Sequence, residues 1–505
     1  MNNPGKGLRA ICLATGLKAS VRPPVIVLGL AALLTALSAA AGSRFKLLFM
    51  HEPDVENISG RVTFVSNPAR LLHQKSGTSM DHIYATALQA DGSWRAYGMF
   101  VLGGDNHSSK PSSAYIACTA RTTNGYTFFD AQQRPWDDGT GPFFNLDKEG
   151  KPNGMLQQTF AYNCDARETL LLYYEHHNPA GNGFGLNAFK STDGLKFTAV
   201  SKTPVFYGQD ALHVMWEPKS RDYLCYQVNY QPCYKKYPDN AQQGRRVITI
   251  RRSHDGATWP PEWNDWTLGP GFPKELMLTP NEKDPEDLEF YWFTPFPYED
   301  RYVGIVSLYE PGPPAVNPRN PDKPGAHGPY LGYEWWVSND ATHWQRPYQM
   351  QYLGLEPGDT AVFAEGVFMA PAGTPVVANG EILFDGTWGV KEDRIAGAAS
   401  GPNAEFSTHQ FTMPAAPLFL NATARWVGQK ESIFLQRQAY IMVEMLNQEG
   451  QVIPGYEKEK CIFGDVDAPD LPLVWAGKNG AGLAGKTVQL RLYFRNARIY
   501  AVAAR

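Results

Sequence analysis

Short apolar segments, separated by polar stretches rich in glycine and proline, run along most of this chain. Within the segments apolar and polar residues alternate or form brief apolar runs, for example at residues 83–88, 169–174, 223–228 and 302–308. Successive side chains of a strand point to opposite faces, so this pattern is typical of β-strands. No stretch keeps the helical period of about 3.6 residues. The pattern therefore predicts an all-β protein.

Four of the predicted strands run into the same turn motif: Ser or Thr, one free position, Asp or Asn, usually Gly, and an aromatic residue four positions after the Asp or Asn. The Asp or Asn positions are Asn124, Asp193, Asp255 and Asp340. Asp-Gly and Asn-Gly favour tight hairpin turns, because Gly accepts positive φ and the Asx side chain bonds its own backbone. Such hairpins occur in many β proteins. A strand–turn–aromatic unit that recurs in order predicts blades around an axis, as in a β-propeller.

The turns lie roughly 60 to 85 residues apart, whereas compact propeller blades repeat every 40–50 residues or so. We therefore expect blades with long loops. From about residue 406 the chain changes to a compact series of alternating strands, for example at 441–446 and 488–494. About 100 residues of this kind fit a small β-sandwich. The predicted organisation is a propeller over residues 42–405 and a sandwich over residues 406–505.

The first 41 residues read as a signal peptide. Basic residues precede an apolar run at 25–37, and the small residues 39–41 offer a cleavage site. The run is short for a spanning helix, although an uncleaved anchor is the alternative. No later segment is apolar enough to span a membrane. We expect the mature protein to be secreted or periplasmic.

Charge and cysteine content exclude some functions. The 505 residues carry a formal net charge of −4, without the excess of basic residues that is typical of nucleic-acid-binding proteins. Five cysteines remain after residue 41, an odd number that rules out a full disulfide framework. Cys225 and Cys233 flank a short segment and can close a loop. No spacing matches a zinc site.

One string in the last 90 or so residues carries a family resemblance. It includes Val443-Glu444, Ile453-Pro454-Gly455-Tyr456, Val474-Trp475, Leu490-Arg491-Leu492-Tyr493 and Asn496-Ala497-Arg498-Ile499-Tyr500. This string resembles the C-terminal β-sandwich that follows secreted bacterial propellers of the glycoside hydrolase-like type. Those propellers are similar to the five-bladed fold of invertase-type and arabinanase-type enzymes. The resemblance implies five blades, with the four turn motifs and one degenerate blade.

The resemblance also implies catalytic acids at the starts of inner strands. Glycoside cleavage needs one carboxyl group as proton donor and a second as base or nucleophile, with pKa values that their environments separate. Carried over by position, Asp81 is the base or nucleophile, Asp210 the orienting acid, and Asp287 or Glu286 the proton donor. The alternative for each is a turn cap, the commoner role of an aspartate before a strand.

The candidate substrate-binding residues are His82, His213, Trp216, Arg252 and Glu365. The histidines can bind hydroxyls or cap loops, and Trp216 can stack on a sugar or fill the core. Arg252 can clamp a carboxylate, but Arg251 and Arg252 face opposite sides of a strand, so at most one reaches the axis. No metal ligands are assigned at the site and no cofactor is expected, although a structural Ca²⁺ in the propeller channel stays open.

Three functions compete. The first is a secreted glycosidase that acts on a polysaccharide or oligosaccharide. The second is a carbohydrate-binding propeller without catalysis, and the third is a structural or protein-binding propeller. The invertase-type opening Asn-Asp-Pro-Asn-Gly is absent, which argues against fructan cleavage, and no arginine triad of the sialidase type is assignable. Two axis-facing carboxyl groups within about 5–10 Å would distinguish the first function from the second.

Overall fold

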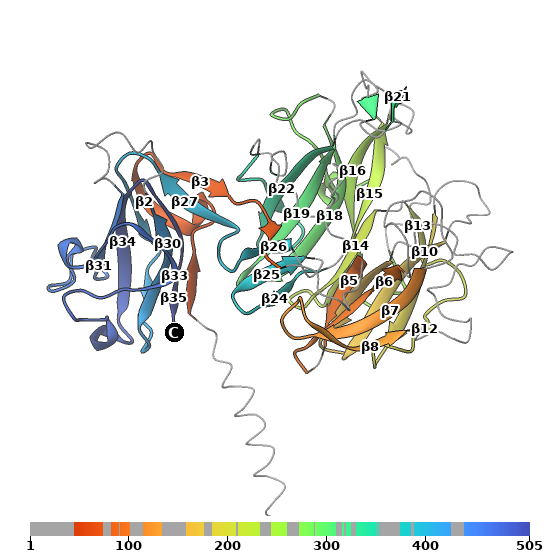
Figure 1. Cartoon of the computed structure of the whole chain (residues 1–505), viewed down its shortest axis with the longest axis horizontal. Helices are drawn as coiled ribbons and strands as arrows, with labels where there is room; N and C mark the ends of the chain where they lie inside the picture. The colour runs from red at the N-terminus through yellow and green to blue at the C-terminus, as the bar shows by residue number, and fades with distance from the viewer. Residues whose placement is uncertain are drawn as a thin grey trace, which may run out of the picture.

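The computed structural model describes two β-sheet regions and the segments that join them (Figure 1). The described residues are 45–73, 82–89, 91–101, 115–133, 158–175, 184–208, 211–232, 244–259, 272–286, 288–309, 316–317, 320–324, 330–349, 351, 353, 374–384, 388–425 and 439–505. Among them, helical structure is limited to four short 3₁₀ turns: η1 (Glu52–Asp54), η2 (Lys274–Leu276), η3 (Lys458–Lys460) and η4 (Ala481–Leu483). None of these turns is long enough to cross a membrane. The all-β prediction is confirmed.

Five antiparallel sheets follow one another in chain order in the larger region. The first contains β5 (His82–Leu88), β6 (Trp94–Val101), β7 (Tyr115–Thr122) and β8 (Phe128–Gln133). The second contains β9 (Gln158–Asn163), β10 (Glu168–Glu175) and β11 (Phe184–Ser191), with β12 (Thr198–Ala199) and β13 (Phe206–Gly208) on β11. The third contains β14 (Leu212–Glu217), β15 (Asp222–Pro232), β16 (Gly244–Ser253) and β17 (Met277–Leu278). The fourth contains β18 (Glu289–Tyr298), β19 (Arg301–Tyr309), β22 (Tyr330–Ser338) and β23 (Trp344–Gln345). The fifth contains β24 (Val376–Ala378), β25 (Glu381–Phe384), β26 (Trp388–Lys391) and β4 (Arg70–Leu71). A separate hairpin pairs β20 (Val316–Asn317) with β21 (Asn320–Pro324).

The four turn motifs form the predicted hairpin structure at the ends of β7, β11, β16 and β22. In each, the Asx side-chain oxygen accepts two successive backbone N–H groups; Asp255, for example, binds those of Ala257 and Thr258, both at 2.8 Å. The other three turns repeat this geometry at Asn124, Asp193 and Asp340. The position after the Asx residue has positive φ in every turn, including the fourth, where Ala341 takes the place of glycine.

Each turn also contacts the preceding sheet. The Tyr97 hydroxyl of the first sheet donates to the Gly194 carbonyl of the second, at 3.0 Å. The Tyr226 hydroxyl of the third sheet donates to the Ala341 carbonyl of the fourth. In the first sheet, Gly125 lies so close to Val376 and Leu383 of the fifth that an added Cβ would touch both. The contacts therefore run round a cycle, in which the first described sheet meets the fifth, as in a propeller.

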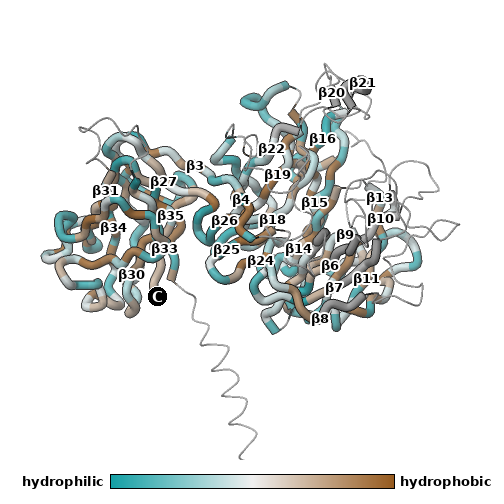
Figure 2. Tube along the Cα trace, viewed as in Figure 1, coloured by the Kyte–Doolittle hydropathy of each residue, from teal (hydrophilic) through white to brown (hydrophobic). Residues whose placement is uncertain are grey.

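Aromatic residues that end the turn motifs pack at these seams. Trp259 is buried, packs at a tilt against Phe206 of the second sheet with ring centroids 5.5 Å apart, and donates its indole N–H to the Gly256 carbonyl. Trp344 of the fourth sheet is edge-on to Tyr226 of the third, with ring centroids 6.2 Å apart. Figure 2 shows the result along the chain, with hydrophobic residues concentrated in the strands and hydrophilic ones in many of the turns.

Replacing Gly256 by alanine should weaken one seam. A Cβ there would lie 2.8 Å from the Leu170 Cδ1 atom, and the residue has φ +70. Positive φ alone costs an L-residue about 1–2 kcal/mol. Gly92→Ala is the matched control, since Gly92 has φ +79 and nothing within 4 Å of an added Cβ. Chemical denaturation should show a larger loss for Gly256→Ala. Equal losses would mean that the seam contact at Gly256 contributes nothing.

The fifth sheet lacks a turn motif because of its connectivity. Its fourth strand is β4, which comes from the N-terminal side and pairs with β26 through Leu71–Trp388 and Arg70–Gly389. No hairpin can join these two strands, since they are far apart in the sequence. Four turn motifs among five described sheets therefore follow from the way in which the last sheet is completed.

The smaller region packs two six-stranded sheets face to face. One contains β1 (Lys46–Leu48), β3 (Thr63–Ser66), β27 (Ala396–Ser400), β30 (Leu418–Ala424), β33 (Val466–Pro472) and β35 (Ala497–Ala504). The other contains β2 (Val55–Gly60), β28 (Ala404–Thr408), β29 (Phe411–Thr412), β31 (Tyr440–Leu446), β32 (Ile462–Phe463) and β34 (Thr487–Arg495). Buried side chains such as Phe406, Trp475 and Phe494 fill the space between them.

The strand pairing alters the expected division at residues 42–405 and 406–505. The N-terminal strands β1, β2 and β3, together with β27 and β28, pair with sandwich strands although most of their residues precede 406. Edge strands from one end of the chain complete sheets built from the other end, a pairing that local patterns do not reveal. The chain thus enters the sandwich, crosses to the propeller and returns.

A buried lysine joins the two regions. The Lys46 Nζ atom lies 2.6 Å from a Glu299 oxygen and 3.0 Å from oxygens of both Glu392 and Asp393. Burial alone would lower the pKa of Lys46, but the carboxylates of Asp393 and Glu299 outweigh it and raise that pKa. These three acids are the one group among the described residues with the spacing of a metal site. The Lys46 ammonium group already lies within 3.0 Å of all three and offsets part of their charge.

Cys225 does not form the disulfide with Cys233 that could close a loop. Cys225 is a free thiol in the middle of β15, completely buried and paired across the sheet with Val214 and Arg251. Cys233 lies outside the described residues. Burial raises the pKa of the Cys225 thiol to about 12, which makes it an inert core residue.

Candidate functional site

The site predicted from the sequence lies where the inner strands begin. The strands β5, β9, β14 and β18 are each the first of a sheet, and each packs against the next along the cycle. Their neighbouring starts form one end of the propeller. We call this end the strand-start end and the other the strand-exit end.

Most of the predicted acids lie outside the described residues: Asp81, Asp210, Asp287 and Glu365. His82 is the first residue of β5, and its side chain is likewise outside the description. Glu286 is described and exposed; its backbone carbonyl accepts a hydrogen bond from the Arg245 guanidinium. The bounds of the described strands still bear on the predicted acids. β5 begins immediately after Asp81 in the sequence, and β14 and β18 begin two residues after Asp210 and Asp287.

The structure separates three of the predicted substrate-binding residues. His213 lies in β14 and is completely buried. Trp216 is near the exit of the same strand, where it packs on Tyr223. Arg252 is also near the strand-exit end; its Nη2 atom donates to Thr342 Oγ1 at 2.7 Å and Nη1 lies 3.4 Å from Asp222. These positions do not bring Trp216 or Arg252 to the strand starts.

Arg251 and Arg252 do face opposite sides, as strand geometry requires. Arg251 is completely buried, with its guanidinium 4.7 Å from the Phe206 ring centroid. Burial lowers the pKa of Arg251 to about 10.

A buried ion pair stands at the strand-start end between the third and fourth sheets. Glu289, the first residue of β18, is completely buried, and its Oε2 atom accepts a hydrogen bond from Arg246 Nη1 at 2.7 Å. The Arg246 guanidinium carbon lies 5.3 Å from the ring centroid of Tyr230 and 5.0 Å from those of Tyr291 and Tyr309. Rings at this distance attract a cation through their negative faces. The tyrosines and the carboxylate together fix the guanidinium in place.

A β-bulge shapes this cluster. The register of β18 on β19 shifts between Phe290 and Trp292, so Tyr291 is the extra residue of the bulge. A bulge bends a strand and turns a side chain in a new direction, and bulges are common beside active sites. Here the bulge lets Tyr291 join Glu289 at Arg246.

The segment that leads into β18 is held by a second arginine. Arg346 Nη2 donates to Asp284 Oδ1 at 2.8 Å, while Nε and Nη2 donate to the two oxygens of Glu334 at 3.0 and 2.9 Å. Both acid side chains are completely buried. The guanidinium carbon also lies 5.0 Å from the Phe290 ring centroid and 5.1 Å from that of Trp336. Two carboxylates therefore bind one planar cation in the core.

The charges of this group shift its pKa values in a consistent way. Burial would raise the pKa of Asp284, but hydrogen bonds from Arg346 outweigh it and lower that pKa. Burial raises the pKa of Glu334, and Arg346 offsets this only in part. Asp284 is thus held ionised two residues before Glu286. The clamp fixes the approach to the acids that the sequence predicts as proton donors.

Sequence reasoning missed Arg246, Glu289 and Arg346. Glu289 carried a signal, since a charged residue that opens an otherwise aromatic strand needs a buried partner. Its partner Arg246 is on another sheet, and the bulge that turns Tyr291 depends on the pairing of β18 with β19. Neither leaves a local pattern in the sequence. Arg246 and the tyrosine rings around it place a fixed positive charge and aromatic side chains beside the strand starts. These groups can orient a polar ligand and the acids that act on it.

No family model matches this chain, and no curated protein matches it. Its fold is similar to that of several solved structures. One is an exo-beta-1,3-galactanase from Phanerochaete chrysosporium, with 8% identity over 88% of this chain and 100% of that chain and a TM-score of 0.35. Another is a family 32 beta-fructofuranosidase from Bombyx mori, with 9% identity over 95% and 99% and a TM-score of 0.33. A third is a thermostable family 43 glycoside hydrolase, with 11% identity over 66% and 87% and a TM-score of 0.34. At this level of similarity, the contacts and charges of the chain itself carry the functional argument.

Proposed function

We propose that the protein hydrolyses O-glycosidic bonds of a polysaccharide or oligosaccharide at the strand-start end of its propeller. Asp81 acts as base or nucleophile, Asp210 orients the donor, and Asp287 or Glu286 donates the proton. The observation that carries this proposal is the position of the strand starts. The described bounds put the beginnings of β5, β14 and β18 one or two residues after Asp81, Asp210 and Asp287.

The surroundings suit acid–base chemistry. Glycoside cleavage needs two carboxyl groups about 5–10 Å apart, one protonated and one ionised at the working pH. Buried arginines near the strand starts, Arg246 and Arg346, provide fixed charge that separates the pKa values of neighbouring acids. Tyr291, half-buried at the bulge, offers an aromatic face and a hydroxyl to a sugar.

Reducing-end release tests the proposal. The purified protein is incubated with a broad panel of oligosaccharides and polysaccharides, beside the variants Asp81→Asn, Asp210→Asn, Asp287→Asn and Glu286→Gln. Asp470→Asn is the control, since Asp470 is an exposed aspartate of the sandwich. We expect release by the wild type and the control, and at least a hundredfold loss in Asp81→Asn and in one of the two donor variants.

Two outcomes would contradict the proposal. Release that survives all four substitutions would remove these acids from the chemistry. Binding of panel sugars without release by the wild type would favour the non-catalytic carbohydrate-binding function instead. Circular dichroism of each variant separates lost chemistry from lost folding.

A further inference from the structure

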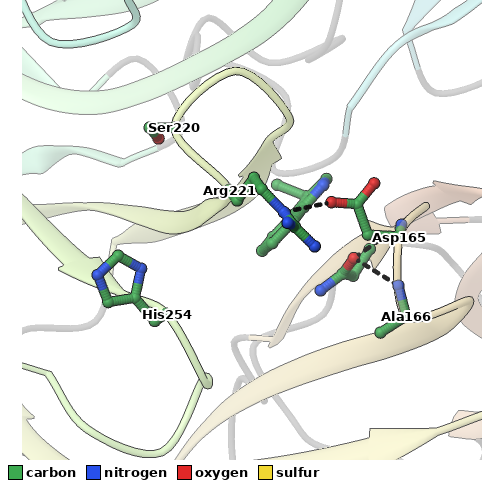
Figure 3. A pocket seen from close by; sticks show the side chains of 7 residues that line it. Asp165, Ala166, Ser220, Arg221 and His254 are labelled. Atoms are coloured by element: carbon green, nitrogen blue, oxygen red, sulfur yellow. Dashed lines mark hydrogen bonds and ion pairs between the residues drawn. The ribbon is translucent and has the colours of Figure 1, made fainter.

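A second candidate site lies at the strand-exit end, far from the predicted acids. A pocket of about 540 Å³ opens between the second and third sheets, where β9, β14 and β16 all end (Figure 3). Its lining residues are Asn163, Asp165, Ala166, Trp216, Ser220, Arg221 and His254. β14 has six residues, so at about 3.3 Å per residue the pocket is roughly 20 Å from the strand-start end.

The pocket presents a carboxylate and a guanidinium side by side. Arg221 Nε donates to Asp165 Oδ2 at 2.8 Å, and the Cys164 thiol lies 3.8 Å from the other carboxylate oxygen. The Arg221 and Asp165 side chains are 72% and 39% exposed, so a ligand can reach both. Figure 3 shows this pair on one side of the pocket and the His254 ring on another. The His254 ring is paired with the Asp222 carboxylate. Asp165 thus balances the charge of Arg221, and the pocket has little net charge.

Short turns hold these groups in place. The Asn163 Oδ1 atom accepts the backbone N–H groups of Asp165 and Ala166, both at 3.0 Å, and its amide nitrogen donates to the Tyr223 hydroxyl at 3.1 Å. On the facing turn, Glu217 accepts the backbone N–H groups of Lys219 and Ser220. The polar groups of the pocket are therefore positioned before any ligand arrives, which lowers the entropy cost of binding.

Trp216 supplies the observation that points to a ligand. The side chain is 9% exposed, and its indole Nε1 atom is buried without a hydrogen-bond partner. Buried indole N–H groups usually find a partner, and leaving a buried donor unsatisfied costs about 1–3 kcal/mol. Trp216 lines the pocket. Because the Nε1 atom itself is covered, a ligand oxygen accepts this N–H only when the indole turns toward the pocket.

We propose that this pocket binds a neutral sugar unit with adjacent hydroxyl groups. Neighbouring hydroxyls of a pyranose donate to a carboxylate and accept from a guanidinium, the combination that Asp165 and Arg221 present. The balanced charge disfavours a phosphate or an acidic sugar. The site is independent of the proposed hydrolysis, since it uses different residues at the opposite end of β14. It gives the protein a second carbohydrate-binding site.

Indole resonances test the proposal. The protein is labelled with ¹⁵N-tryptophan, and the Trp216 signal is identified as the one missing in Trp216→Phe. Methyl pyranosides of glucose, galactose, mannose, xylose and arabinose are then titrated separately. We expect at least one to move the Trp216 signal, with affinity reduced about tenfold in Arg221→Gln and in Asp165→Asn, the effect of roughly one hydrogen bond.

Stability provides the second measurement. Trp216→Phe keeps an aromatic ring and removes the unsatisfied donor, so the variant should be no less stable than the wild type while binding the sugar about tenfold more weakly. The inference is overturned if no glycoside moves the Trp216 signal, or if the shift persists unchanged in both polar variants. Failure here leaves reducing-end release unaffected, because that assay depends on the acids at the strand-start end.

Discussion

Replacing Arg346 by methionine should lower the free energy of unfolding by about 3–5 kcal/mol. The guanidinium is the common partner of Asp284 and Glu334, two acids whose side chains are completely buried. Without it, two carboxylates remain in the core with no opposing charge, and each must be desolvated or protonated on folding. Methionine preserves much of the packing on Phe290 and Trp336, so the loss reports mainly the charge. Urea denaturation followed by tryptophan fluorescence measures it.

Arg425→Met provides the control for Arg346. Arg425 lies 3.9 Å from Asp467, and its side chain is 57% exposed. Exposed ion pairs contribute about 0–1 kcal/mol, so the control should stay close to the wild type. Similar small losses in both variants would show that the Arg346 clamp does not stabilise the fold. If the clamp positions the segment before β18, Arg346→Lys should also slow sugar release more than it weakens substrate binding, because a lysine cannot bind two carboxylates in a bidentate manner.

The Arg246–Glu289 pair should show strong coupling in a double-mutant cycle. Glu289→Leu removes the carboxylate that binds a buried guanidinium, and Arg246→Met removes the guanidinium that binds a completely buried carboxylate; each should cost about 3–5 kcal/mol. The combined variant Arg246→Met/Glu289→Leu removes both charges and fills the space with apolar atoms. We expect it to be more stable than either single variant, since apolar replacements of whole buried pairs are often neutral or stabilising. Denaturation of the four proteins gives the coupling energy.

The same four proteins distinguish a structural pair from a functional one. If the costs of the single substitutions simply add, the two residues do not interact as the 2.7 Å contact implies. If the combined variant is stable and still releases sugar at the wild-type rate, the pair serves only the packing of the third and fourth sheets. A stable combined variant with reduced release would place the pair among the residues that position the site.

Local chemistry made parts of this fold predictable. The Asx-Gly turns need only a few consecutive residues, so their hairpins at Asn124, Asp193 and Asp255 are readable in the sequence and formed in the structure. The fourth turn forms without glycine, because its Asx hydrogen bonds and buried seam hold Ala341 at φ +59. Strand patterns likewise predicted an all-β chain and a C-terminal sandwich. The catalytic assignments at Asp81, Asp210 and Asp287 stay predictions.

Contacts between distant segments were decided by the tertiary structure. The closing strand β4, the N-terminal strands of the sandwich and the Lys46 bridge each join residues hundreds of positions apart, and the sequence around them carries no mark of the partner. The separation of Trp216 from the strand starts, and the pairing of Arg246 with Glu289, also depend on which sheets become neighbours. By itself the sequence determined the hairpins, the strands and the all-β fold class, since each depends on interactions within a few residues. The ring, its closure and the grouping of buried charges depend on long-range packing, which only the folded chain defines.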